Sequence, residues 1–571
     1  MIKFGKGVVK CRFLILILAF LLLIPSAIGY MKTRINYDIL SYLPGQIETM
    51  KGQDILLDEF GTGAFSFVVV EGMQDKDLQK IADKIEDVPH VKNVIWYGSI
   101  MDFSIPREAL PDDIYNFFNN KDADSQLMAV LFDESMSSDG TMDAIQTIND
   151  LVGKQCFVSG MASVNNDIRK LAENESVIYV LIAVVLSLIV LSLTMDSVVV
   201  PFLFLISIGM AIIYNLGSNV FFGEISYITK ALAAVLQLGV TMDYSIFLLS
   251  SYEENKERFP DDRERAMGHA IANTFKSIVG SSVTTIAGFA ALCFMTFALG
   301  RDLGIVSAKG VVIGVICCVT VLPAMILIFD KPIEKTKHKP LIKSMDRLSG
   351  FITKHYKIWL VIFLVLLAPA IYGNSNTKIY YNIAKSLPST LESNVANEKL
   401  EEDFDMSVLH MVMMDKNMDA KDKRDMLNAI DEVDGVKWTI SLNSLVGATI
   451  PDSMIPKDIK SMLQSDNWEL AFVCSKYQSA TEEVNSQIAQ INDIVKGYDE
   501  NAMVIGEAPM MKDLEDVTNI DLQSVNTVSM AAIFIIIMII FKSISLPIIL
   551  VAVIEFAIAV NMAVPFYQNI S

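Results

Sequence analysis

Long apolar stretches alternate with long polar segments along the chain. A bilayer core of roughly 30 Å requires about 20 apolar residues of helix, because an unpaired backbone amide in lipid is costly. Nine stretches meet this requirement, at approximately 13–30, 176–195, 198–218, 229–251, 278–299, 304–329, 358–373, 524–541 and 546–566. We expect the first to be a retained anchor and not a cleaved signal, because its apolar run is long and further spans follow. The pattern predicts a polytopic α-helical membrane protein.

The two long polar segments, 31–175 and 374–523, have a different pattern. Short β-like runs such as 66–71 and 409–414 alternate there with helical stretches such as 75–87 and 419–433. This alternation predicts one small α+β domain in each segment.

Basic residues indicate the orientation of the spans. They are concentrated in two loops, as Lys256, Arg258, Arg263, Arg265 and Lys276, and then as Lys331, Lys335, Lys337, Lys339, Lys343 and Arg347. Loops rich in Lys and Arg remain on the cytoplasmic side of a membrane. We therefore expect a cytoplasmic N-terminus, with both α+β domains outside.

Composition narrows the class of function. Hydrophobic residues make up 52% of the 571 residues and charged residues only 20%, as expected for membrane spans joined to soluble domains. The net charge of -20 comes mainly from the polar segments, which argues against nucleic acid as a partner. The five histidines and six cysteines show no HExxH or CxxC spacing, so we expect no metal and no cofactor. Without a nucleophile motif or a phosphate loop, we do not expect an enzyme.

The strongest organisational signal is an internal duplication with an offset of about 345 residues. INYDILSYLP at 35–44 reappears as KIYYNIAKSLP at 378–388, FGTGAFSFVVVEG at 60–72 matches FDMSVLHMVMMDK at 404–416, and IPREALPDDI at 105–114 matches IPDSMIPKDI at 450–459. Duplicated halves in a membrane protein usually enclose a pathway with sites near the bilayer midplane, which makes a transporter the leading class. Because 225–226 matches 570–571, we expect the second repeat to be truncated before its last three spans.

One acidic residue lies inside the fourth predicted span. An ionised Asp243 there would cost several kcal/mol, so its carboxyl is expected to be protonated, paired with another helix or in contact with water. Intramembrane acids that bind and release protons are functional candidates. The Tyr244 hydroxyl could form hydrogen bonds across helices, and Gly239, one turn earlier, permits close helix approach. The alternative is that Asp243 only holds helices together or lies near the inner end of the span.

The fifth predicted span carries a stripe of small polar residues. Ser281, Thr284, Thr285 and Gly288 recur at helical spacing, as expected for a single helix face. Such a stripe could line a proton path, or it could simply pack against another helix. Gln237 in the fourth span leaves the same two alternatives open.

The fourth span also resembles a known family. The pattern GxxxDYxxFLxSxYxE, formed by Gly239, Asp243, Tyr244, Phe247, Leu248, Ser250, Tyr252 and Glu254, is similar to the fourth-span motif of the MmpL family in the resistance-nodulation-division (RND) superfamily. The order of span, outer domain and bundle is also similar, and 176–329 resembles a sterol-sensing domain. The resemblance implies that Asp243 and Tyr244 belong to a proton relay, and that inward proton flow drives transport. The family's second relay pair lies in a tenth span, beyond the nine predicted here.

The prediction is therefore an RND-like protein in a bacterial cytoplasmic membrane that exports lipids, hydrophobic or amphipathic molecules, or drugs. Its expected parts are a first span (1–30), an outer α+β domain (31–175), a five-helix bundle (176–329), a cytoplasmic loop (330–357), a seventh span (358–373), a second outer domain (374–523) and two last spans (524–571). Expected partners are membrane lipids, the exported molecule and protons, with a homo-oligomer or accessory proteins left open. The alternative is a lipid or sterol sensor, or a scaffold, that does not transport.

Overall fold

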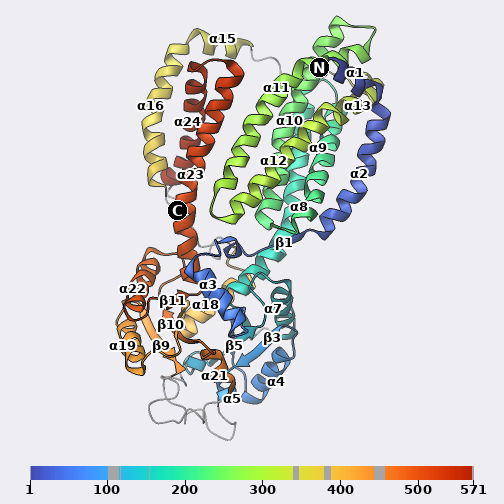
Figure 1. The fold of residues 1–571 in the computed structure, drawn as a ribbon. Coiled ribbons are helices and arrows are strands. Elements are labelled where there is room, and N and C mark those ends of the chain that lie inside the picture. Colours follow the sequence, from blue (N-terminus) through green and yellow to red (C-terminus); the bar gives the residue numbers. More distant parts are fainter. Residues whose placement is uncertain are drawn as a thin grey trace. The chain divides into compact units, whose positions relative to one another are not determined.

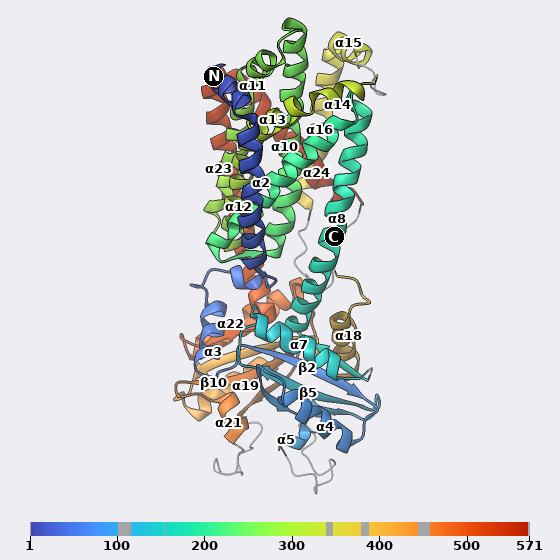
Figure 2. The same cartoon turned by 90° about the vertical axis from the view of Figure 1, so that its right-hand side faces the viewer.

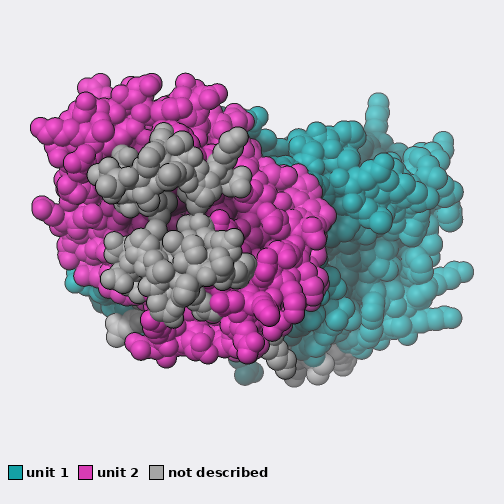
Figure 3. Space-filling model, turned by 90° about the horizontal axis from the view of Figure 1, so that it is seen from below, with its two compact units in different colours: residues 1–36, 173–380, 520–571 teal, residues 37–172, 381–519 magenta. Residues whose placement is uncertain are grey.

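The computed structural model describes residues 2–100, 115, 117–153, 155–338, 346–377, 387–442 and 457–568. The chain divides into two compact units, which Figure 3 shows in different colours. We call residues 1–36, 173–380 and 520–571 the helical unit, and residues 37–172 and 381–519 the sheet unit. Each unit therefore combines segments from both halves of the chain.

The helical unit contains the membrane-spanning helices (Figure 1). Within the described residues, nine helical segments are long and apolar enough to cross a membrane. They are α2 (Arg12–Lys32), α8 (Met161–Thr194), α9 (Val199–Gly217), α10 (Tyr227–Arg258), α11 (Arg263–Ala291), α12 (Ala298–Val319) with α13 (Val321–Ile328), α16 (Tyr356–Asn376), α23 (Glu507–Phe541) and α24 (Ser545–Gln568). Shorter helices are α1 (Ile2–Lys10), α14 (Asp330–Lys335) and α15 (Asp346–Lys354). The predicted polytopic helical membrane protein is confirmed.

Small residues allow the helices of this unit to pack closely. α9, α10 and α12 contact one another, and α16 contacts α24. A methyl group on Gly373 of α16 would lie only 2.6 Å from Cβ of Ala563 in α24, so these two backbones approach closely because glycine has no side chain. Two short strands, β1 (Arg34–Asn36) and β7 (Glu224–Ser226), pair in parallel in the same unit.

One turn of the helical unit was hidden in the sequence because it is apolar. Only four residues separate the predicted spans 278–299 and 304–329. In the structure, α11 ends at Ala291, eight residues before the end of the first predicted span. In the turn that follows, the Asp521 carboxylate of α23 accepts hydrogen bonds from the backbone N–H groups of Thr296 (2.9 Å) and Phe297 (2.8 Å). Backbone donors at the start of a helix have no partner inside it, so this distant acid satisfies them.

The sheet unit contains two antiparallel sheets of the same topology (Figure 2). The first, in the order β3-β5-β2-β6 with β4 beside β5, is formed by β2 (Ala64–Glu71), β3 (Val91–Ile95), β4 (Asn119–Asn120), β5 (Ser125–Phe132) and β6 (Cys156–Ser159). The second, in the order β9-β10-β8-β11, is formed by β8 (Val408–Asp415), β9 (Val436–Ser441), β10 (Trp468–Ser475) and β11 (Met503–Ile505). Each strand of the second sheet follows its counterpart by about 345 residues, so the internal repeat is confirmed.

Helices complete both α+β halves of the sheet unit. They are α3 (Glu48–Asp58), α4 (Asp75–Glu86), α5 (Tyr97–Ile100) and α7 (Asp139–Leu151) in the first half, and α18 (Glu392–Phe404), α19 (Ala420–Asp431), α21 (Lys457–Leu463) and α22 (Glu482–Tyr498) in the second. The first helix of each half packs on the sheet of the other half, since α3 contacts β11 while α18 contacts β6 and β2. The two halves therefore share one folded unit.

Two equivalent hydrogen bonds hold α3 and α18 in place against the opposite halves. The Asp167 carboxylate of α8 accepts from the backbone N–H of Ser393 at 3.0 Å, and the Asp513 carboxylate of α23 accepts from the Thr49 hydroxyl at 2.6 Å. Asp167 precedes Asp513, and Thr49 precedes Ser393, by about 345 residues, so the two bonds are equivalent under the repeat. The helices α8 and α23, which continue into the helical unit, thus each hold the first turn of a helix from the opposite half.

Several sequence predictions fall outside the described residues. The repeat pair at 105–114 and 450–459 lies wholly or largely there, as do most of 378–388 and the residues 570–571. In the predicted cytoplasmic loop, Lys339 and Lys343 also lie outside the described residues.

Candidate functional site

α10 carries the acid that the sequence singles out. Asp243 lies near the middle of α10, and its side chain is on the exposed side of this helix in the described chain. Tyr244 is buried instead, with 2% of its surface exposed, and its hydroxyl has no hydrogen-bond partner among the described residues. α10 therefore carries a carboxyl on one face and a buried phenol on another.

The two predicted packing glycines have open surroundings. Gly239 is exposed on α10 and Gly288 is half-buried on α11. Within the described chain, no atom from elsewhere would lie within 4 Å of a methyl group on either residue. A close helix approach at these positions therefore stays a prediction.

The hydroxyls of the predicted stripe on α11 bond within their own helix. The Thr284 and Thr285 hydroxyls donate to the carbonyl of Ser281 at 2.7 and 3.1 Å. Ser281 is exposed, and both threonines are half-buried. These contacts satisfy the threonine donors locally, and they leave open whether the stripe packs or conducts protons.

A buried polar contact lies where α9, α10 and α12 meet. The Asn215 side-chain amide of α9 donates to Oε1 of Gln237 in α10 at 3.1 Å, and the two residues are 0% and 3% exposed. A methyl group on Gly310 of α12 would lie 2.6 Å from the Asn215 amide nitrogen. Glycine at this position therefore makes room for two amides between three helices.

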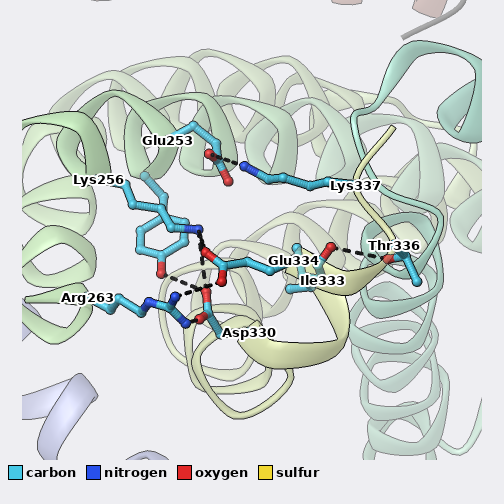
Figure 4. Close-up of polar contacts among 9 residues, drawn as sticks. Glu253, Lys256, Arg263, Asp330, Ile333, Glu334, Thr336 and Lys337 are labelled. Carbon is cyan, nitrogen blue, oxygen red and sulfur yellow. Dashed lines mark hydrogen bonds and ion pairs between the residues drawn. The ribbon is translucent and has the colours of Figure 1, made fainter. Parts of the chain in front are cut away.

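An ion-pair network joins the end of α10, the start of α11 and α14 (Figure 4). Lys256 lies 3.6 Å from Asp330 and 3.2 Å from Glu334, and Arg263 pairs with both carboxylates. The Tyr252 hydroxyl also donates to Asp330, which is only 4% exposed, at 3.3 Å. Hydrogen bonds from Lys256 and Arg263 lower the pKa of Glu334, which keeps its carboxylate ionised. The network anchors the end of the helix that carries Asp243.

The sheet unit contains a partly open aromatic pocket of about 710 Å³, which we call the aromatic chamber. Its lining is dominated by large apolar side chains from both halves of the repeat, among them Phe65, Phe67, Phe117, Phe118, Trp438 and Phe472. Phe117 and Trp438 meet edge to face at 5.3 Å between ring centroids. Burial raises the pKa of Asp431 at the chamber wall, although the Thr439 hydroxyl donates to its carboxylate at 3.0 Å. A mainly apolar cavity of this size matches those that enclose small organic ligands.

A second, more polar cavity of about 440 Å³ shares part of this lining. Phe65, Phe67 and Leu409 line both cavities. The second cavity adds the carboxylates of Glu398, Glu401 and Glu507, and its described lining contains no Lys, Arg or His. The sheet unit therefore places an apolar chamber beside an acidic one.

The sequence did not reveal the chambers or the ion-pair network, because their residues come from segments far apart in the chain. Lys309 of α12 was missed as well, although a basic residue within an apolar span is a usable signal. For metals, the described residues contain no cluster of three or more His, Cys, Asp or Glu that could hold an ion.

Comparison with known proteins identifies related chains. A family model described as MMPL family matches residues 50–349 and 384–570, which is most of the chain. The siderophore exporter MmpL5 of Mycobacterium tuberculosis is 22% identical over 426 residues, covering 68% of this chain and 43% of that protein.

Two proteins from bacilli are also similar. The membrane protein YdgH of Bacillus subtilis is 25% identical over 413 residues, covering 68% of this chain and 44% of that protein. The apo-petrobactin exporter of Bacillus anthracis is 23% identical over 312 residues, covering 51% of this chain and 42% of that protein. The chain thus spans less than half the length of these relatives.

Proposed function

Because the chain belongs to the MMPL family, we propose that this multi-pass membrane protein is a transporter that exports hydrophobic or amphipathic molecules and is driven by inward movement of protons. The observation that carries the proposal is the position of Asp243 in the membrane-spanning helix α10. The surrounding helix is apolar, and an ionised acid at the centre of such a helix costs about 3 kcal/mol on insertion scales. The protonated and the ionised form of a carboxyl at this position are therefore stable in different surroundings.

In this mechanism, Asp243 binds a proton from the outer side and releases it on the inner side. Each protonation state stabilises a different arrangement of α10 against its neighbours, which is what coupling to transport requires. Tyr244 provides the adjacent hydroxyl of the relay, and Gly239 with the α11 stripe of Ser281, Thr284, Thr285 and Gly288 provides a face on which another helix can move. The ion-pair network around Asp330 would hold the inner end of α10 meanwhile.

The exported molecule is proposed to bind in the sheet unit. Two of the similar proteins are named as exporters, the siderophore exporter MmpL5 and the apo-petrobactin exporter. The aromatic chamber of about 710 Å³ offers apolar contact, while the adjoining acidic cavity offers hydrogen-bond acceptors. Side by side, they suit a molecule with one apolar and one polar part.

The proposed orientation follows from the basic loops. Lys256 and Arg263, with the other Lys and Arg residues near them, are expected on the cytoplasmic side together with the N-terminus. The sheet unit then lies outside a bacterial cell membrane, where it would receive or release the exported molecule.

The experiment is export of an amphipathic substrate from cells that produce the Asp243→Asn variant. Asparagine has nearly the same shape but cannot release a proton, so export should be lost while membrane insertion remains normal. Glu257→Gln is the matched control, because it removes an exposed acid from the same helix outside the pattern that carries the family resemblance. Undiminished export by Asp243→Asn would exclude this mechanism, whereas absence of export by the wild-type protein would favour a sensor or scaffold that does not transport.

A further inference from the structure

The contact between Asn215 and Gln237 lies deep below the end at which α10 begins. Gln237 is ten residues after the first residue of α10, Tyr227, which at 1.5 Å per residue corresponds to about 15 Å. α9 ends at Gly217, close to Asn215. Between this residue and the start of α10, the chain forms a short 3-10 helix and β7. Backbone that leaves the α-helix at such a depth is stable only when protein buries it or when it lines a cavity that holds water.

Lys309 of α12 lies at this level. Its ammonium group donates to the carbonyl of Asn215 at 3.0 Å and to the side chain of Asn219, and it stands 5.0 Å from the centroid of the Phe222 ring. A charged group in this position needs polar surroundings. The outer end of the three-helix contact is therefore polar beside Lys309.

The direct route between α10 and α12 is closed above this level. Ile225, Ala233 and Val306 form a small apolar cluster there and are 2%, 1% and 0% exposed. The polar groups beside Lys309, on the side of α9, offer an approach to Gln237 that avoids this cluster.

Below Gln237, polar side chains continue along one face of α10. Thr241 and Tyr244 follow at spacings of four and three residues, which keeps them on the same helix face. A methyl group on Gly314 of α12 would lie 2.5 Å from the Thr241 hydroxyl oxygen, so glycine again makes room for a polar group. On the other side of Gln237, Ser307 of α12 precedes Gly310 by one turn, is next to Val306 in the chain and is 4% exposed.

Many polar atoms along this seam have no protein partner. Among the described residues, no hydrogen bond reaches Oδ1 of Asn215, Nδ2 of Asn219, Nε2 of Gln237 or the hydroxyls of Thr241, Tyr244 and Ser307. All six side chains are at most 4% exposed. Each buried polar atom left unpaired costs about 1–3 kcal/mol, and ordered water is the usual partner where protein provides none. Their concentration in one seam therefore indicates water between the helices.

We infer that the seam between α9, α10 and α12 holds a file of water molecules that carries protons from the side of Lys309 to Tyr244, next to Asp243. This inference rests on the proposed function, because the path ends at Tyr244, the residue that follows Asp243 and that the proposed relay pairs with it. The proton moves along hydrogen-bonded water and hydroxyl groups, and no covalent bond other than O–H bonds forms or breaks.

Charged groups of both signs lie near the entrance. Lys309 and Asp302 lie on α12, and Arg34 pairs with Glu224 at 2.8 Å. The Asp302 carboxylate accepts from the backbone N–H of Ser226 at 2.8 Å at the start of α10. These groups make this end of the seam polar. The α11 stripe, by contrast, satisfies its threonine hydroxyls within its own helix.

A labelling experiment tests the water directly. In a protein whose native cysteines are replaced by alanine, Thr241→Cys should react with a small, water-soluble methanethiosulfonate reagent added to membranes. Ala233→Cys is the matched control, because it lies two turns earlier on the same face of α10 but in the apolar cluster, and should not react. Protection of Thr241→Cys equal to that of Ala233→Cys would overturn the inference.

A transport experiment then separates the path from the proposed function. Thr241→Val and Gln237→Leu should slow proton-coupled export by about tenfold or more, whereas Thr241→Ser should retain it. Ser282→Ala is the control, since its buried hydroxyl donates to the Ile278 carbonyl of its own helix at 2.6 Å and should leave the rate unchanged.

The two failures have different signatures. If Asp243→Asn abolishes export but Thr241→Val and Gln237→Leu export at the full rate, the water path is wrong and the proposed function stands. If Asp243→Asn exports normally, the proposed function fails. If the two seam variants lose export only because less protein is inserted, and the rate per inserted molecule is unchanged, the seam is only structural and the inference is wrong.

Discussion

Asp38 makes the stability of the sheet unit depend on pH. It lies in INYDILSYLP at 35–44, a segment of the first repeat that the second repeat matches, and only 5% of its surface is exposed. Burial raises the pKa of Asp38 from 3.8 to about 6, although the backbone N–H of Leu40 donates to its carboxylate at 3.0 Å and opposes the rise. The second repeat has Asn382 at the matching sequence position, so an amide is the natural substitution to test.

The sign of the effect follows from proton binding. Between pH 3.8 and about 6, the folded protein holds the Asp38 proton more tightly than the unfolded chain does. The free energy of unfolding therefore falls as the pH rises through this window, and it remains lower above it. A shift of about two pKa units corresponds to at most about 3 kcal/mol.

The assay compares the melting temperatures of the wild-type protein and the Asp38→Asn variant, purified in detergent, from about pH 4 to about pH 8. The amide never ionises, so the melting temperature of the variant should increase relative to that of the wild type as the pH rises to about 6. Above this pH, the difference in melting temperature should stay constant. Each kcal/mol corresponds to about 2–4 °C in a unit of this size. A difference in melting temperature that does not change over the whole pH range would refute the reasoning.

Four further substitutions test buried charges and hydrogen bonds. Lys423→Met should destabilise the protein by about 3–5 kcal/mol, because it leaves the buried Glu469 without its cation. The Glu469 side chain is 4% exposed and lies 2.7 Å from Lys423. Replacing both residues by apolar ones should restore most of the lost stability in a denaturation experiment. Asp330→Ala should cost about 3 kcal/mol in thermal unfolding, since two basic side chains then lose a buried partner; an unchanged melting temperature would contradict this role. Asp167→Ala and Asp513→Ala should each cost about 1–2 kcal/mol, and markedly unequal losses would show that the two bonds are not equivalent.

The sequence predicted the architecture well because its signals are local or repetitive. A membrane span is encoded by a continuous apolar run, and the duplication is visible as matching sequence segments about 345 residues apart. Both were confirmed by the nine helices within the described residues and by two sheets with the same strand order. The turn before α12 was not visible, because Asp521, which accepts its backbone donors, is distant in the chain.

The candidate site was only partly predictable, for a similar reason. Asp243 stands out as an acid in an apolar run, so the sequence alone singles it out. Which side of α10 it faces depends on packing, and so does the contact between Asn215 and Gln237, which needs Gly310 from a third helix. The aromatic chamber joins residues from both repeats, such as Phe67 and Phe472, and no spacing rule brings them together.

The most direct test of the account measures proton and substrate movement together in vesicles that contain the purified protein. A proton gradient directed from the side of the sheet unit should drive both movements in the wild type. Asp243→Asn should abolish both, while Glu257→Gln should abolish neither. Coupled movement of protons and substrate at the wild-type rate by Asp243→Asn would contradict the claim that this carboxyl couples the two.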